Sequence, residues 1–95
     1  MKSITKEVLR REVRVSDGAT YVYTLTCGEG QRVACFGLTL YSVSIEMTAE
    51  DGRHTSSSLE EIFVDGKRAV KFFERLVENL ATPIDLPYVL EDEMR

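Results

Sequence analysis

The chain has 95 residues, of which 43% are hydrophobic and 29% charged, and its formal net charge is −4. This length and composition are typical of one folded domain with its own core, and they exclude a disordered chain of low hydrophobicity and high charge. Residues 36–95 carry twelve acidic and six basic side chains, a surplus of acid that opposes nucleic-acid binding, because such binding needs Lys and Arg to neutralise phosphates.

Targeting and metal-binding signals are missing from the sequence. The apolar runs are only a few residues long, so we predict a single cytoplasmic domain over residues 1–95 with neither a signal peptide nor a membrane span. Cys27 and Cys35 are too few for a disulfide framework, and together with His54 they cannot form a zinc quartet. We expect both thiols to be reduced and packed in the core, although a hairpin that brought them together would allow a disulfide. No metal or cofactor is expected.

Two Asp-Gly dipeptides, Asp17-Gly18 and Asp51-Gly52, each lie between alternating segments and indicate two β-hairpins. For the first, we predict a three-residue loop that starts at Ser16, because it pairs apolar side chains across the hairpin: Val15 with Ala19, Val13 with Tyr21 and Leu9 with Leu25. A two-residue loop would instead set Arg14 beside Tyr21.

The first predicted strand, residues 4–15, follows this register. It turns Leu9, Val13 and Val15 towards the core and leaves a basic stripe on the outer face, formed by Lys6, Arg10 and Arg14 with Glu12 between them. Arg11 interrupts the inward pattern. Residues 4–9 also fit helical spacing, so a helical turn there remains an alternative to strand.

Two further strands are predicted at residues 20–27 and within residues 33–48. Their odd-numbered residues alternate as apolar positions, so Tyr21, Tyr23 and Tyr41 are assigned to the core rather than to a platform that stacks nucleic-acid bases. On the opposite face, Phe36, Leu38 and Leu40 form an apolar segment near Gly37 that needs a covering partner. A short polar strand, residues 53–57, is expected at an edge of the sheet.

The C-terminal part of the sequence changes to helical periodicity. Ser58 to Glu61 resembles a capping box for a helical turn, and Asp65 is a suitable N-cap for a main helix. That helix buries a stripe at three- and four-residue spacing, formed by Ala69, Val70, Phe73, Leu76, Val77 and Leu80. Pro83 ends it, and a short final helix follows from Asp85. The predicted fold is α+β: an antiparallel meander of three to four strands packed against one main C-terminal helix and a short terminal helix.

The second half of the sequence also resembles a known family. The segment Tyr41-Ser-Val-Ser-Ile-Glu46, the Asp51-Gly52 turn, an acidic step into a helix and the segment from Pro83 to Asp92 resemble a family of small uncharacterised proteins from Firmicutes, a domain of unknown function. The resemblance covers about half of the chain and implies a bacterial cytosolic domain. It implies no functional residue.

No group of residues predicts catalysis. His54 follows a tight turn beside Ser56 to Ser58, but adjacent residues of a strand point to opposite faces, so we expect a solvated strand end. The carboxylates at residues 60–61 and 91–93 lack the spacing of a calcium loop and are expected to be solvated. The chain is therefore predicted not to be an enzyme.

Two functional hypotheses remain. The first is a noncatalytic protein-interaction or regulatory module that self-associates or binds a protein partner through an apolar surface, formed by Val22, Phe36, Leu38 and Leu40. The second is a domain that binds a small ligand or anion on the basic stripe of Lys6, Arg10 and Arg14. That stripe also fits the protection of a sheet edge.

Overall fold

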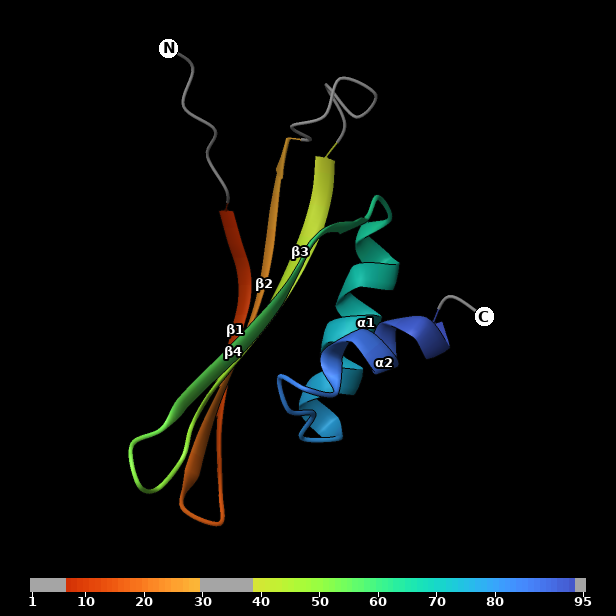
Figure 1. Ribbon diagram of the computed structural model, residues 1–95. Helices are drawn as coiled ribbons and strands as arrows, with labels where there is room; N and C mark the ends of the chain where they lie inside the picture. The colour runs from red at the N-terminus through yellow and green to blue at the C-terminus, as the bar shows by residue number, and fades with distance from the viewer. Residues whose placement is uncertain (1–6, 30–38, 94–95) are drawn as a thin grey trace.

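The structure is a computed structural model, which describes residues 7–29 and 39–93. Four antiparallel strands form one sheet in the order β1-β2-β3-β4: β1 (Glu7–Ser16), β2 (Ala19–Glu29), β3 (Thr39–Thr48) and β4 (His54–Phe63). Two helices, α1 (Gly66–Glu78) and α2 (Leu86–Glu93), lie on one face of this sheet (Figure 1). The α+β meander with C-terminal helices is confirmed. Neither helix is long and apolar enough to cross a membrane, within the ranges described.

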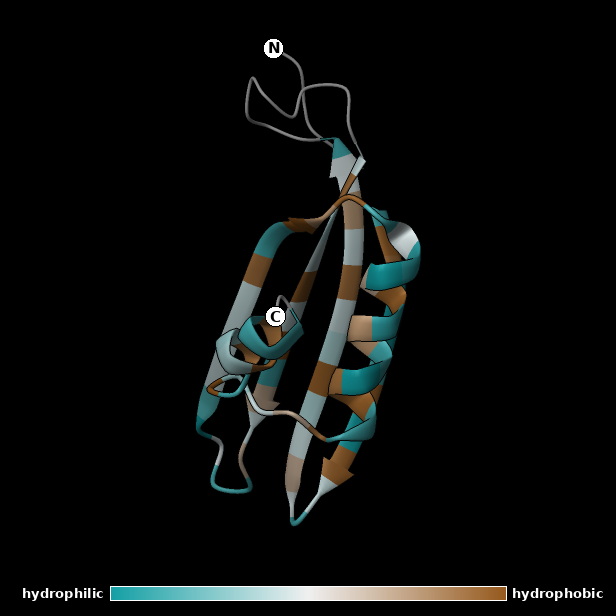
Figure 2. Ribbon diagram, turned by 90° about the vertical axis from the view of Figure 1, so that its right-hand side faces the viewer, coloured by the Kyte–Doolittle hydropathy of each residue, from teal (hydrophilic) through white to brown (hydrophobic). Residues whose placement is uncertain are grey.

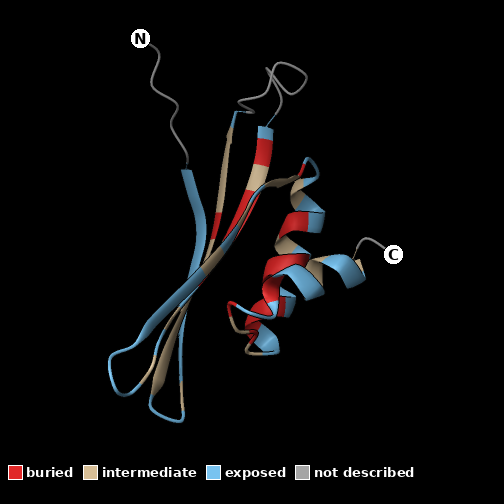
Figure 3. Ribbon diagram, viewed as in Figure 1, coloured by how far each residue is buried: buried red, intermediate tan, exposed pale blue. Residues whose placement is uncertain are grey.

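The core lies between the sheet and the two helices (Figure 3). Tyr23, Val43 and Phe73 are at most 1% exposed, as the alternation of the two central strands and the helical stripe predict. Phe72 is also fully buried, although the predicted stripe of α1 did not include it. The centroids of the Phe72 and Phe63 rings are 5.3 Å apart. Burial of these aromatic rings adds to the hydrophobic stabilisation from the aliphatic side chains of the core.

The β1–β2 hairpin corrects the predicted register. Ser16 pairs with Ala19, so the loop has two residues, and Asp17 and Gly18 both take positive φ angles of 50° and 79°. Two positive φ angles define the type I′ turn, which Asp-Gly favours because its twist matches that of the strands. The predicted three-residue loop is therefore wrong, and Arg14 lies opposite Tyr21.

This register reverses the predicted faces of β1. The side chains of Arg10, Glu12 and Arg14 share the helix-bearing face with the Tyr and Leu side chains that they oppose on β2. Val13 and Val15 point instead to the open face, where Val15 is 70% exposed. The arrangement is stable because β1 is an edge strand that α1 does not cover, and it has no buried residue. Its charged side chains therefore remain in water on the helix-bearing side.

Strand β4 is longer than the sequence predicts. It runs to Phe63, so Ser58 to Glu61 continue the strand and do not open a helical turn. A bulge lies between the Tyr41–Phe63 and Val43–Leu59 pairs. Within it Glu61 has a φ of 53°, and its N–H donates to the buried Ser42 Oγ at 2.8 Å. This side-chain acceptor replaces a ladder hydrogen bond that the bulge interrupts, so ten residues of β4 stay in the sheet.

Both helix starts agree with the sequence. Asp65 caps α1 by accepting from the Lys67 N–H at 2.9 Å. Hydrophilic and hydrophobic residues alternate along α1 with the period of an amphipathic helix (Figure 2). The helix ends at Glu78, before the predicted Leu80, which takes a φ of 50°. The short helix α2 follows Asp85, as predicted, and packs against β4.

Candidate functional site

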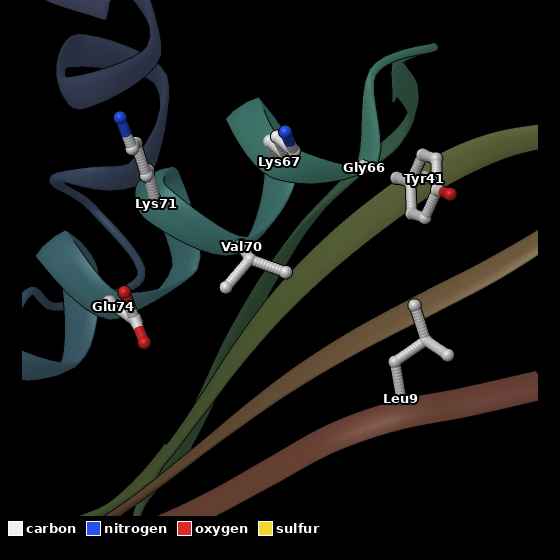
Figure 4. A pocket seen from close by; sticks show the side chains of 7 residues that line it. All are labelled: Leu9, Tyr41, Gly66, Lys67, Val70, Lys71 and Glu74. Atoms are coloured by element: carbon white, nitrogen blue, oxygen red, sulfur yellow. The ribbon is translucent and has the colours of Figure 1, made fainter.

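A groove runs between the uncovered strand β1 and helix α1. Its larger hollow has a volume of about 600 Å³ and is hereafter called the β1–α1 groove (Figure 4). It is lined by Leu9, Tyr41, Gly66, Lys67, Val70, Lys71 and Glu74. This volume lies within the range of pockets that bind small molecules or anchor side chains of a partner.

A β-bulge brings Leu9 into the groove. Val8 pairs with Thr26 and Arg10 pairs with Leu25, so Leu9 is an extra residue in β1 with no partner of its own on β2. The extra residue shifts the alternation by one, and Leu9 turns towards Val70 and Tyr41 (Figure 4). Leu9 stays 42% exposed, so the groove presents an apolar side chain to solvent.

The opposite wall of the groove is the first two turns of α1. Gly66 starts the helix where the Tyr41 ring comes close, and a Cβ at this position would lie 2.8 Å from the Tyr41 hydroxyl oxygen. A glycine here lets the tyrosine ring lie close to the helix start. Tyr41, Val70 and Leu9 together form an apolar floor.

Two lysines stand at the rim of this floor. Lys67 and Lys71 are four residues apart on α1, a spacing that places both on one side of a helix. Both are exposed, and neither ammonium group has an ion-pair partner among the described residues. Lys71 points away from the floor in Figure 4, and its flexible four-carbon stem has to turn for its ammonium group to reach a carboxylate bound there.

A second, more polar hollow of about 320 Å³ continues the groove along α1. It is lined by Arg10, Glu12, Arg14, Phe73, Glu74, Val77 and Glu78, and Glu74 is common to both hollows. Arg10 pairs with Glu74 at 3.5 Å and Arg14 with Glu12 at 3.1 Å. The groove is therefore basic at the Lys67 end, while its other end is balanced by ion pairs and carries the acid Glu78.

The predicted basic stripe has a different setting from the one expected. Arg10 and Arg14 face the groove rather than solvent on the outer side of the sheet, and each is paired with a carboxylate. Lys6 lies outside the described residues. An ion pair lowers the positive potential that an arginine offers to a further anion, so these residues form a charge-balanced wall.

The predicted apolar surface is placed only in part. Val22 lies half-buried on the open face of the sheet, opposite Val13, whereas Leu40 is 4% exposed and offers little surface to a partner. Phe36 and Leu38 lie outside the described residues. The structure does not bring Val22 and Leu40 together, because they lie at different heights on neighbouring strands.

The other chemically interesting side chains lie outside the groove lining. His54 is exposed at the start of β4, with its Nδ1 3.2 Å from Thr48 Oγ1, as a solvated strand end predicts. Cys27 is a free, half-buried thiol on the helix-bearing face, and Cys35 lies outside the described residues. Within the described ranges, no three His, Cys, Asp or Glu side chains gather in a way that would hold a metal ion.

One clearly shifted pKa among the described residues belongs to the core. Burial raises the pKa of Tyr23 to about 12, with the nearby Tyr21 as a smaller cause. The Tyr23 hydroxyl donates to the Ala81 carbonyl at 2.8 Å and thereby joins β2 to the segment between the helices. This tyrosine is structural, and it lies outside the groove lining.

Sequence reasoning missed the groove as a unit. Leu9, Val70 and Tyr41 were assigned to the core, and Lys67 and Lys71 were not singled out. The signal that was available is the step Asp65-Gly66-Lys67, in which a glycine at the first helical position indicates a close neighbour. The bulge at Leu9, which completes the floor, has no sequence signature.

Comparison with known proteins gives one match. A model of a family described as a family of unknown function (DUF6514) matches residues 4–95. No curated protein and no solved structure matches the chain. The function therefore has to be argued from the geometry of the chain itself.

Proposed function

Because the chain belongs to the family of unknown function DUF6514, which assigns it no activity, we propose from its geometry that it is a noncatalytic protein-binding domain. Its binding site is the β1–α1 groove. The partner segment carries one or two large apolar side chains followed by carboxylates. The observation behind this proposal is an apolar floor left open to solvent beside two lysines that have no acidic partner within the described residues.

The apolar floor supplies the affinity. A partner side chain that covers Leu9, Tyr41 and Val70 removes apolar surface from water at both sides of the contact, at roughly 25 cal/mol per Å². Anchors of this kind, seated in a pocket at the centre of an interface, account for most of the binding free energy in protein complexes. A charged partner side chain that stayed in water at the same place would add much less binding free energy.

The lysines supply the selectivity. Lys67 and Lys71 carry positive charge to one end of the groove, and the acid Glu78 lies at the other. A segment with carboxylates at the Lys67 end is favoured, and one with lysines there is repelled. A free inorganic anion on Arg10 and Arg14 is not favoured in this way, because those guanidinium groups already have Glu74 and Glu12 as partners.

The proposal is tested by selecting peptides from a phage-displayed library of random sequences. We expect enriched sequences that combine Leu, Ile, Tyr or Phe with Asp or Glu. Their affinity for the wild-type chain is measured by fluorescence anisotropy. Val70→Asp places a carboxylate in the floor and should weaken the selected peptides at least about tenfold, or about 1.4 kcal/mol.

The matched control is Val13→Asp, the same exchange on the open face of the sheet, which should leave affinity unchanged. Lys67→Glu combined with Lys71→Glu changes two exposed side chains, so it tests the site even if Val70→Asp unfolds the domain. A library that yields no enriched sequence would overturn the proposal. Selected peptides that bind the Lys67→Glu, Lys71→Glu double variant as tightly as the wild type would do the same.

A further inference from the structure

A second apolar and acidic feature lies around the start of α2. Ile84 is 73% exposed in the turn that precedes α2, and Tyr88 is 67% exposed in the first turn of the helix. Asp92, a further four residues along α2, is also exposed. We call this group of Ile84, Tyr88 and Asp92 the α2 knob. Large exposed apolar side chains of this kind, a tyrosine above all, are enriched at protein interfaces.

Taking the groove as a protein-binding site, as proposed above, we infer that its partner is the α2 knob of a second copy of this chain. The knob has the chemistry that the groove selects. Its two apolar side chains fit the floor of Leu9, Tyr41 and Val70, and its carboxylate follows at the distance of one helical turn for Lys67 or Lys71.

The knob cannot fill the groove of its own chain. Helix α2 packs against β4, at one edge of the sheet, and the groove lies over β1 at the other edge. Helix α1 stands between them over the central strands (Figure 1). The complementary pair therefore meets only between two chains.

Groove and knob also lie on the same, helix-bearing face of the sheet, on opposite sides of α1. When two chains meet through this face about a twofold axis, a knob that lies in the groove of the other chain is repeated by the same contact in the opposite direction. Such a contact is closed and self-complementary. It is also made twice, which matters because one knob alone buries far less than the roughly 1,200–2,000 Å² of a stable interface.

The test is sedimentation velocity of the full chain from about 5 to about 500 µM, a range that covers dimers of ordinary micromolar affinity. The wild type should form dimers. Ile84→Ser combined with Tyr88→Ser, and separately Lys67→Glu combined with Lys71→Glu, should each raise the dimer dissociation constant at least tenfold. The matched control is Val13→Ser combined with Val15→Ser, which removes two exposed apolar side chains from the open face and should leave the dimer unchanged.

Two further measurements test the reciprocal arrangement. A mixture of the knob variant and the groove variant retains one intact contact, so it should associate more tightly than either variant alone and less tightly than the wild type. Adding Asp92→Lys to the Lys67→Glu, Lys71→Glu variant reverses both partners and should recover part of the lost affinity. Failure of both recoveries would overturn the knob-in-groove contact.

Other outcomes separate this inference from the proposed function. A wild-type chain that stays monomeric while library peptides still bind the groove overturns the self-association and leaves the protein-binding role standing. A chain that is monomeric and selects no peptide overturns both. Dimers that survive the knob and groove variants, or open chains of many copies, overturn the reciprocal contact.

Discussion

The buried hydroxyl of Tyr23 gives the sharpest test of how the helices are held on the sheet. It donates to the Ala81 carbonyl at 2.8 Å, and both residues are nearly inaccessible to solvent. In Tyr23→Phe the carbonyl loses its donor and stays buried, which costs about 1–3 kcal/mol of unfolding free energy. Tyr88→Phe removes an exposed hydroxyl and should cost almost nothing.

The same hydroxyl makes the stability depend on alkaline pH. In the unfolded chain the tyrosine ionises near its ordinary value of 10.0, whereas in the folded chain burial raises the pKa of Tyr23 to about 12. Because the folded state holds the Tyr23 proton more tightly, the hydroxyl's contribution to the unfolding free energy is fully present below about pH 10. It is lost as the pH rises towards 12. The difference between the folded and unfolded pKa values corresponds to at most about 2–3 kcal/mol of unfolding free energy.

Urea unfolding followed by circular dichroism, at about pH 8 and about pH 11.5, measures both effects. The wild type should be more stable than Tyr23→Phe at the lower pH, and the difference should shrink at the higher pH, because only the wild type has this proton to lose. Other ionisable groups titrate in both proteins and cancel in the comparison. A difference that stays constant between the two pH values would refute the buried, neutral hydroxyl.

Two further predictions concern the turns and the bulge. Ser42→Ala removes the acceptor of the Glu61 N–H and should cost about 1–3 kcal/mol, with faster amide exchange at Glu61, whereas Ser44→Ala on the same strand should change neither quantity. Gly18→Ala and Gly52→Ala both place a Cβ at positive φ, so each should cost about 1 kcal/mol in urea unfolding. Only the first meets a neighbour, the exposed Glu50 side chain, which can swing away; a much larger loss for Gly18→Ala would show that Glu50 is fixed.

The sequence was informative wherever a strand or helix is covered on one side only. Strands β2 and β3 lie beneath α1, so their alternation reports directly which side is apolar, and Tyr23 and Val43 were placed correctly. Helix α1 was predicted from its cap at Asp65 and its apolar stripe for the same reason. In these elements the local pattern and the tertiary environment agree.

For strand β1 the same reasoning gave the wrong register. Alternation reports the buried face only where a strand has a covered side. Applied to β1, it led to the prediction of a three-residue loop, which would turn Val13 and Val15 inward. Because β1 is an uncovered edge, its pattern carried no information about the register, and the turn preference of Asp17-Gly18 decided it instead. For an edge strand, the turn chemistry is thus a better guide than the apolar pattern.

The predicted helical turn at the end of β4 was wrong for a related reason. Ser58 to Glu61 match a helix cap by spacing alone, but Ser58 and Leu59 pair with β3, and the Ser42 hydroxyl accepts from the Glu61 N–H within the bulge that follows. The pairing partner lies some twenty residues away. A local motif cannot report a contact over that distance, so tertiary pairing overrode the cap.

The error at β1 and the candidate site have one physical cause. Two helices cover β2 to β4, and no described element of this chain lies over the helix-bearing side of β1. Arg10 and Glu12 can be charged because that strip is uncovered, and for this reason alternation did not predict the faces of β1. The same strip leaves Leu9 and Val70 open to solvent as part of the groove floor. A domain that needed only stability would gain by closing this strip with apolar side chains from α1. The lysines at its rim match the acidic, apolar partner proposed above, and this is why the groove is the surface on which the function should first be sought.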